Sequence, residues 1–465
     1  MKILSMRNFT IFLLFMTWSF PSSSKSISLD IANNSYSLCK SKDWIDIEPY
    51  LMAPLRANIN SGIANCNWLK AIKKLKNQKK VPINVLEYAG GFRISASKFG
   101  DFERATTDYS YGVFAYDPKR NSIFVVGHPA KSAIAEFPLP EIRLTDDIND
   151  FDIAKKPRQP FVAFDGTKRV DTGIKHYFRA TGLAKIDNAI VMNYINWYDA
   201  SGLEKDTSIM IWDASQLAKS AAYGPYQIQG AAHASGWISP IPEYLHDLLG
   251  GTYITGNQPY ASISSRLSVG PSAFSYDPRK DIVYGPAGEV STNALMDFPL
   301  KYYLKDDQLY SSTQDKDGVL YNKDGKNKLW TILSGASYGF IVPNSRTYLT
   351  LGFSGGHMSG AGYKIKQDTG RLCGGPCSKV AKDNHSYYWL WDVMDFVKVR
   401  LGIMKPHEIR PYSYGRFMLP ESFTNKSISS GSYDPINNRL FLSIKGGDKQ
   451  NKYARPPLFL VFKLP

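Results

Sequence analysis

No apolar run in this sequence is long enough to cross a bilayer as a helix, for which about 18 residues are needed. The longest candidate, FTIFLLFMTWSF, covers only residues 9–20. It follows a start that carries Lys2 and Arg7, and it precedes the small residues PSSSKS. This order is typical of a signal peptide. We therefore expect residues 1–24 to be a signal peptide, no transmembrane segment, and a mature protein that is secreted or periplasmic, with an uncleaved anchor as the alternative.

Acidic residues are also in short supply. There are 41 Asp and Glu against 56 Lys and Arg, a formal net charge of +15. A basic exported protein commonly meets a polyanion. The sequence offers no recognition helix and no basic run longer than KKLKNQKK at residues 73–80, which disfavours nucleic acid. We expect a monomer whose partner is an anionic polysaccharide.

Apolar stretches with the period of a helix are scarce, whereas aromatics make up 13% of the chain and Gly and Pro number 36 and 27. This composition favours many short strands joined by turns. The length exceeds what one hydrophobic core usually serves, so several domains or a repeat is expected. We assign residues 25–80 to an irregular or helical N-terminal segment that covers one face, and residues 81–465 to the repeat.

An internal repeat built on Tyr-Asp-Pro supports this assignment. Its clear copies are FAYDPKRNSIFVVGH (114–128), FSYDPRKDIVYGP (274–286) and GSYDPINNRLFLSIKG (431–446), and weaker copies cover 181–199 and 338–357. Each copy predicts a hairpin, with Asp capping the turn, and each is followed by a further strand. This pattern predicts an all-β β-propeller with five to seven blades, of which residues 226–242 and 316–333 would hold the two less regular ones.

The four cysteines allow two pairings or a metal site. Cys39 and Cys66 could form a disulfide in an oxidising compartment. A Gly-rich loop, residues 355–391, carries the other two cysteines and two histidines: His357, Cys373, Cys377 and His385. Tetrahedral zinc accepts such a set, and the two histidines favour structural zinc. The alternative is a Cys373–Cys377 disulfide, which the short spacing allows.

Candidate site residues lie at the ends of the predicted hairpins, where the loops of a propeller converge near its axis. His128 ends the first repeat, and the same position of the second repeat carries Tyr194, Trp197 and Tyr198. Arginines beside strand signals could hold a carboxylate or sulfate bidentately, and His233 is a reserve candidate. These arginines are Arg93, Arg179 and Arg266.

Histidine and tyrosine beside a cation that neutralises a carboxylate are the groups that β-elimination of a uronic acid needs. One of them removes the C5 proton, another protonates the leaving oxygen, and the arginine stabilises the carboxylate. Glycoside hydrolysis would instead need two placed carboxylates. Glu136 and Asp199 are possible, but both lie in apolar strand contexts. A polysaccharide lyase is therefore the first hypothesis, and a non-catalytic propeller that binds anionic glycans or a surface partner is the second.

Several motifs together carry a resemblance to a known family: GGFRIS, VVGH with AIAEFPLP, NWYDASG, GWISPIP and SSRLSVGPSAFSYDP. In order and spacing they resemble secreted β-propeller proteins of the ulvan-lyase type, over residues 84–440. The resemblance implies seven blades, a sulfated uronate polysaccharide as substrate, zinc in the 355–391 loop, and site roles for His128, Tyr194 or Tyr198, and Arg266. Val269 stands where similar proteins carry tyrosine, which puts the activity in question.

Overall fold

The computed structural model describes residue 39 and residues 44–164, 178–196, 199, 202–257, 266–423 and 426–464. The predicted signal peptide lies outside the described residues, as do Trp197 and Tyr198. Within the described ranges, no helix combines the length and the apolar character that crossing a membrane requires.

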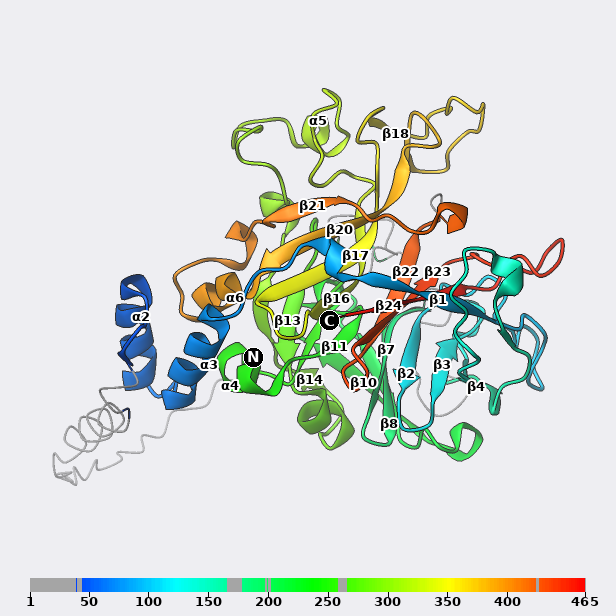
Figure 1. The fold of residues 1–465 in the computed structure, drawn as a ribbon, viewed down its shortest axis with the longest axis horizontal. Helices are drawn as coiled ribbons and strands as arrows, with labels where there is room; N and C mark the ends of the chain where they lie inside the picture. The colour runs from blue at the N-terminus through cyan, green and yellow to red at the C-terminus, as the bar shows by residue number, and fades with distance from the viewer. Residues whose placement is uncertain are drawn as a thin grey trace, which may run out of the picture.

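Five sheets dominate the described chain (Figure 1). Each contains four antiparallel strands, and two carry a short fifth strand that pairs in parallel. We call the sets of four antiparallel strands blades 1 to 5 and give the strands of each blade from the inner strand outward. Blade 1 contains β2 (Phe114–Asp117), β3 (Ser122–Val126), β4 (Ile134–Pro138) and β6 (Gln159–Val162), and blade 2 contains β7 (Phe178–Ile186), β8 (Ala189–Asn196), β9 (Ser208–Ile211) and β10 (Ala222–Ile228). Blade 3 contains β11 (Ile238–Pro240), β12 (Tyr253–Thr255), β13 (Ala273–Tyr276) and β15 (Asn293–Met296), and blade 4 contains β16 (Gly335–Ile341), β17 (Thr347–Gly355), β20 (Asn384–Asp392) and β21 (Ser413–Arg416).

Blade 5 joins the two ends of the repeat region. Its first three strands, counted from the inner strand outward, are β22 (Ile428–Asp434), β23 (Arg439–Ile444) and β24 (Leu458–Lys463). Its outer strand is β1 (Glu87–Ile94), from the start of the propeller. β1 pairs antiparallel with β24, with Glu87 opposite Lys463 and Arg93 opposite Leu458. This pairing closes the ring with backbone hydrogen bonds between the two ends of the repeat region.

The inner strands contact one another in the cyclic order β2, β7, β11, β16, β22 and back to β2. The β-propeller is therefore confirmed, and the ring formed by the described residues closes with five blades. The seven blades implied by the resemblance are not confirmed. The two segments proposed for additional blades lie elsewhere: residues 226–242 run from β10 into β11, and residues 316–333 hold helix α5 (Lys316–Leu320) in the linker from blade 3 to blade 4.

The Tyr-Asp-Pro repeat marks the inner hairpin in four blades but not in blade 3. The copies at 114, 181, 338 and 431 span β2–β3, β7–β8, β16–β17 and β22–β23. The copy at 274 instead begins within the third strand, β13, and its predicted second strand is a π-helical turn, Arg279–Val283. The inner hairpin of blade 3, β11–β12, carries no such motif. The sequence analysis therefore took the third strand of this blade for its inner strand.

The turn chemistry itself is confirmed. The Asp117 carboxylate accepts a hydrogen bond from the backbone N–H of Lys119 at 3.0 Å, and Asp434 accepts one from Ile436 at 3.0 Å. An Asp side chain that captures the amide two residues on stabilises the bend before the chain turns back. The same short-range bond therefore forms in the inner hairpins of blades 1 and 5.

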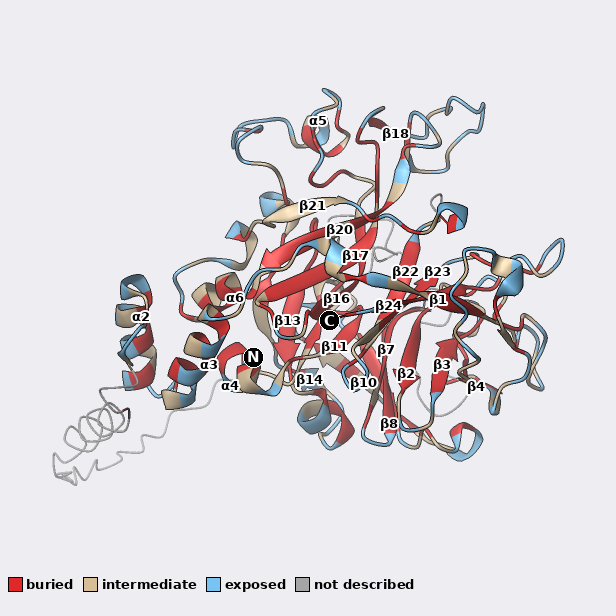
Figure 2. Ribbon diagram, viewed as in Figure 1, coloured by how far each residue is buried: buried red, intermediate tan, exposed pale blue. Residues whose placement is uncertain are grey.

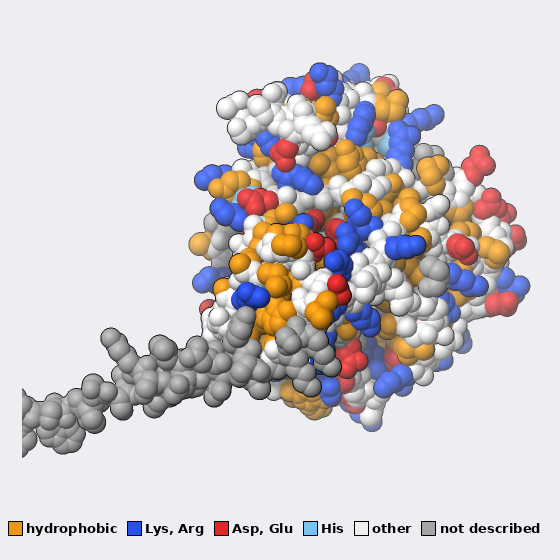
Figure 3. Space-filling view, turned by 60° about the vertical axis from the view of Figure 1, so that its left-hand side comes forward, with side chains coloured by type: hydrophobic (Ala, Val, Ile, Leu, Met, Phe, Trp, Pro, Cys, Tyr) orange, Lys and Arg blue, Asp and Glu red, His pale blue; other side chains and the backbone are white. Residues whose placement is uncertain are grey.

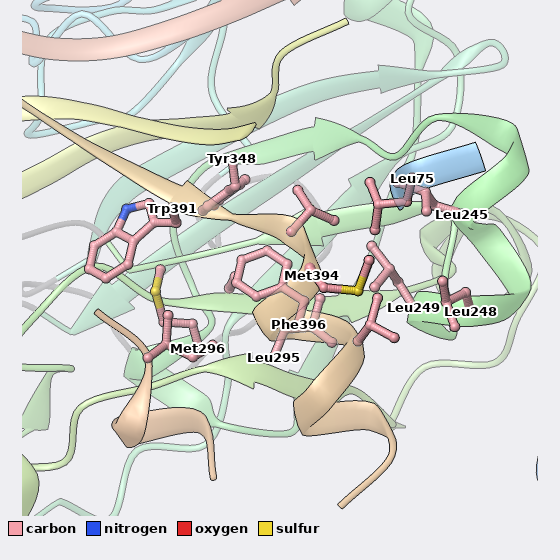
Figure 4. Packing of buried hydrophobic residues seen from close by; sticks show 14 of the residues in the cluster. Leu75, Leu245, Leu248, Leu249, Leu295, Met296, Tyr348, Trp391, Met394 and Phe396 are labelled. Carbon is pink, nitrogen blue, oxygen red and sulfur yellow. The ribbon is translucent and has the colours of Figure 1, made fainter. Parts of the chain in front are cut away.

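Helices α2 (Pro49–Asn60) and α3 (Cys66–Lys76) precede the propeller and pack on it beside α4 (His246–Leu249) and α6 (Val393–Arg400). Leu75 of α3 shares one hydrophobic cluster with Leu249, Met394 and Phe396 (Figure 4). A disulfide between Cys39 and Cys66, with an S–S distance of 2.03 Å, anchors the start of α3, a pairing that the sequence had left open. The strands are almost wholly buried while the loops remain exposed (Figure 2), so the blades position loop residues on a rigid support.

Four short strands complete the fold. β5 (Ile153–Ala154) pairs parallel with β1, and β14 (Glu289–Val290) pairs parallel with β10. β18 (Ala361–Tyr363) and β19 (Pro376–Ser378) form a separate hairpin. This hairpin and the α5 segment lie together at the upper edge of Figure 1, away from the inner strands.

Candidate functional site

In every blade the inner strand begins where the second strand ends, because the two are antiparallel. Contacts between blades hold these ends together. The Ser443 hydroxyl at the end of β23 donates to the Gly112 carbonyl before β2 at 2.7 Å, and a guanidinium nitrogen of Arg179 at the start of β7 lies 3.5 Å from the Pro129 carbonyl after β3. Blades 5, 1 and 2 therefore bring loop residues to one shared edge of the ring.

His128 lies at this edge, as expected, in partly buried surroundings at the end of blade 1's second strand. Its ring makes an edge contact with Tyr109, whose side chain is 55% exposed, at 6.0 Å between centroids. Burial lowers the pKa of His128, and the positive charges of Arg104 and Arg179 lower it further, against the opposing effect of Asp108. The imidazole is therefore neutral near neutral pH.

The hydrogen bond that His128 makes decides which nitrogen carries its proton. The backbone N–H of Ala130 donates to Nδ1 at 3.1 Å, so Nδ1 is the acceptor and the neutral ring carries its hydrogen on Nε2. In this tautomer Nε2 is a hydrogen-bond donor. This arrangement suits a group that donates a hydrogen bond to an anion, and it does not suit a base that removes a proton through Nε2.

Arg179 and Lys445 supply positive charge beside His128. The Lys445 ammonium lies 3.9 Å from the centroid of the Tyr111 ring, a cation–π contact between blade 5 and blade 1. The Lys445 side chain reaches solvent, yet desolvation lowers its pKa, and the charge of Arg179 lowers it further. The charge of Arg179 therefore acts on Lys445, although the two residues come from different blades.

We call Tyr109, Tyr111, His128, Arg179 and Lys445 the mouth cluster. His128 and Arg179 were predicted from the sequence, while both tyrosines and Lys445 were missed. The motif DYSYG at residues 108–112, just before a predicted inner strand, was the available signal for the tyrosines. Tyr109 also has a positive φ of 54°, which is uncommon for a bulky residue and frequent at functional sites.

Tyr194 and Arg266 lie together beside Ile195, the strand partner of Arg179. Both line a small pocket of about 20 Å³ with three carboxylates, Asp199, Glu204 and Asp206. Tyr194 is fully buried, and burial, followed by the charges of Asp206 and Glu204, raises its pKa far above the ordinary value. Its hydroxyl is therefore unsuited to exchange protons with a substrate, in contrast to the role predicted for it.

Two further substrate-binding candidates already have charged partners. Arg93 donates to both oxygens of Asp448, at 3.0 and 3.1 Å, and the Asp448 side chain is only 1% exposed. His233 Nδ1 lies 2.7 Å from an oxygen of Asp297. These pairs join separate segments of the fold, which corrects the prediction that Arg93 holds a substrate carboxylate. Val269 is buried in the core shared with the helices.

The two carboxylates considered for hydrolysis are structural. Glu136 is fully buried and accepts hydrogen bonds from Arg120, Ser122 and Gln159. Asp199 accepts the backbone N–H groups of Gly202 and Glu204 and so shapes its own loop. Neither carboxylate belongs to the mouth cluster, so Glu136 and Asp199 do not form a catalytic pair there.

The four residues predicted to bind zinc are arranged differently. Cys373 and Cys377 form a disulfide in the β18–β19 hairpin, which is the alternative that the spacing had left open. Both ring nitrogens of His357 are engaged, Nε2 with the Ser354 hydroxyl at 2.6 Å and Nδ1 with the Asn327 carbonyl at 2.9 Å. Within the described residues no group of three or more His, Cys, Asp or Glu side chains is placed to hold a metal ion. The residues in this arrangement do not fit the zinc site.

Counting free thiols on the denatured, unreduced protein separates the two states of this loop. We expect none, because all four cysteines are paired. A structural zinc site would instead leave two titratable thiols and release about one zinc ion per chain, measured by metal analysis. Cys373→Ser with Cys377→Ser serves as the matched variant, since it should lower the zinc content only if zinc is bound there.

Comparisons with known proteins give no family. No protein-family model matches the chain, and no curated protein matches it. Solved structures with some likeness include a luciferin-regenerating enzyme (8% identity, 76% of this chain and 92% of that one, TM-score 0.31). A structure from the GH130 family of mannoside phosphorylases is 10% identical, over 84% of this chain and 97% of that one, with a TM-score of 0.37. A glycosyl hydrolase from Bacteroides ovatus is 12% identical, over 83% of this chain and 96% of that one, with a TM-score of 0.35. At these TM-scores the likeness carries no argument about function.

Proposed function

We propose that this protein is an exported β-propeller that binds an anionic polysaccharide at the mouth cluster. One observation carries the proposal: a histidine from blade 1, an arginine from blade 2 and a lysine from blade 5 meet at one edge of the ring, each at the end of a rigid strand. Two disulfides suit an oxidising compartment.

The chemistry of the mouth cluster matches an acidic sugar chain. A guanidinium can hold a carboxylate or a sulfate in two parallel hydrogen bonds, and an ammonium and the Nε2–H of His128 add further donors. Tyr109 offers an exposed ring face to a sugar. On the flank shown in Figure 3, basic side chains are mixed with acidic, hydrophobic and neutral ones.

The proposal predicts that Arg179→Ala and Lys445→Ala each weaken binding of a sulfated uronate polysaccharide about tenfold or more, because each removes a charge-assisted contact worth roughly 1.5–3 kcal/mol. Titration calorimetry at several salt concentrations measures both the affinity and the salt dependence. Lys219→Ala removes an exposed lysine outside the cluster and should leave the affinity unchanged. Unchanged affinity in both cluster variants would contradict the proposal.

β-Elimination of an ulvan-like polymer is the second candidate, favoured by the phenol of Tyr109 beside the imidazole of His128. In that reaction Tyr109, as phenolate, would take the C5 proton of the uronate, the electron pair would form the C4–C5 double bond, and the C4–O bond would break. The phenol formed in this way would return the proton to the leaving oxygen, while His128 Nε2–H and Arg179 would donate hydrogen bonds to the carboxylate.

The ultraviolet absorbance of the unsaturated uronate tests this activity, and Tyr109→Phe supplies the control that retains the ring. Absorbance that rises with the natural chain and not with Tyr109→Phe would establish a lyase with these roles. A flat trace from a protein that still binds the polymer would leave a binding propeller.

A further inference from the structure

A second cavity, of about 820 Å³, lies outside the mouth cluster and shares no residue with it. It forms between the linker from blade 3 to blade 4, residues 300–316, and the loop that follows α6, represented by His407 and Arg410. Three lysines, one arginine and three tyrosines line it, together with a single carboxylate, Asp307. The size is that of a typical small-ligand site, and aromatic rings beside cations form its walls.

The cavity is held in shape by its own contacts. Arg410 donates to Asp307 through two nitrogens, at 2.8 and 2.6 Å, and to the carbonyls of His407 and Ile409. Tyr310 is buried, and its hydroxyl donates to Asp324 at 3.1 Å. These bonds tie the linker to the loop, so the walls are in place before any ligand arrives, which lowers the entropic cost of binding.

The positive charge that remains is placed for an anion. Asp307 is already matched by Arg410. In the part of the chain that the structure describes, neither Lys301 nor Lys305 forms an ion pair with a carboxylate. The Lys305 ammonium donates to the carbonyls of Tyr310 and Ser311, which orients it and leaves its charge uncompensated.

An aromatic platform lies beside these ammonium groups. The rings of Tyr302 and His407 stack at 4.0 Å with an angle of 9° between their planes, and Tyr302 remains 44% exposed. The Lys301 ammonium lies 5.2 Å from the Tyr302 ring centroid. A sugar ring that packs on such a face places its substituents next to the lysine.

From this geometry we infer a second binding subsite, at which Tyr302 stacks on a sugar ring and Lys301 and Lys305 bind its sulfate or carboxylate. The inference extends the proposed function and rests on it for the class of polymer. Two subsites on one rigid propeller would bind a long acidic polymer more tightly than either subsite alone, since the second contact forms at a high effective concentration.

Calorimetric titration with two short oligosaccharides, one sulfated on a neutral backbone and one an unsulfated uronate, tests the subsite. The natural chain should bind two molecules of at least one of them. The variant Lys301→Ala with Tyr302→Ala should bind one, or bind the second at least tenfold more weakly, and Tyr50→Ala, which removes an exposed tyrosine of α2, should behave like the natural chain. An unchanged stoichiometry and affinity in the double variant would overturn the subsite.

The same titration separates failure of the subsite from failure of the proposed function. Arg179→Ala with Lys445→Ala should abolish the mouth site and retain the subsite. If this variant binds like the natural chain while Lys301→Ala with Tyr302→Ala binds nothing, the subsite stands and the mouth site fails. Equal binding of an uncharged oligosaccharide in the subsite would overturn its assignment to acidic sugars, and the comparison of the two acidic probes tells sulfate from carboxylate.

Discussion

Replacing Glu136 with alanine is expected to lower the free energy of unfolding by about 3–5 kcal/mol, because it leaves Arg120 without its buried partner. Glu136, on β4, is fully buried and receives Arg120 Nε at 2.7 Å, the Ser122 hydroxyl at 2.7 Å and the Gln159 amide at 2.6 Å. Urea unfolding, followed by intrinsic fluorescence, measures the change.

Two variants bracket this result. Glu136→Gln keeps the shape of the side chain and part of its hydrogen bonding, so it should lower the free energy of unfolding by less than Glu136→Ala does. Glu141→Ala removes an exposed carboxylate, with 64% of its side chain accessible, and should change stability by less than about 0.5 kcal/mol. A loss of less than about 1 kcal/mol for Glu136→Ala would show that the network contributes little.

The hydrogen-bond network around Glu136 also makes the stability of the fold depend on pH. Burial alone would raise the pKa of Glu136, but the hydrogen bonds from Arg120, Gln159 and Ser122 outweigh it and hold the pKa below the ordinary value of 4.5. A carboxyl group whose pKa is lower in the folded state stabilises the fold above its unfolded pKa, and this contribution disappears as the pH falls through the folded pKa. The stability difference between the natural chain and Glu136→Ala should therefore narrow in acid.

Gly182→Ala is expected to cost about 3 kcal/mol, the upper part of the range for overpacking. Gly182 lies on β7, where a Cβ atom would meet the Gly236 carbonyl oxygen of blade 3 at 1.9 Å. The strands cannot simply separate, because the Thr181 hydroxyl donates to the Ser235 carbonyl and the Asn193 amide to the Gly236 carbonyl, at 2.6 and 2.9 Å. A methyl group here must therefore push two blades of a closed ring apart.

Thermal unfolding measures this effect against a matched glycine variant. A Cβ at Gly374, in the loop of the β18–β19 hairpin, meets no atom within 4 Å. Gly374→Ala should therefore leave the thermal unfolding midpoint close to that of the natural chain. Equal midpoints for the two variants would mean that the contact between blades 2 and 3 can relax without cost.

The fold class could be predicted because its signal is local. Asp117 and Asp434 bond to amides two residues ahead in the chain, so the hairpins they begin are visible in any window of sequence. The blade count could not be predicted in the same way. β11 and β12 have three residues each and no Tyr-Asp-Pro turn, and they hold their places through pairing with β13 and contact with β7 and β16.

In the candidate site, too, local features could be predicted from the sequence, whereas contacts between distant segments could not. His128 and Arg179 were found because each lies at the end of a strand that the repeat had marked. Lys445 and Tyr111 are 334 positions apart, and only closure of the ring by β1 and β24 brings them together. Tyr194 was misjudged because both faces of β8 are buried between blades, so alternation along the strand exposes neither.

By itself, the sequence determined the turn positions, the preference for strands, the basic charge and the reactive residues available to the loops. These properties follow from residue type and from bonds between near neighbours. The tertiary structure alone decided that the described blades number five, that Arg93 is matched by Asp448, that Cys373 bonds to Cys377, and that three blades share one mouth cluster. The blade count, the Arg93–Asp448 pair and the mouth cluster depend on distances between segments far apart in the chain, which are set only when the ring closes. The Cys373–Cys377 bond is local, but the spacing alone allowed both a disulfide and a zinc site.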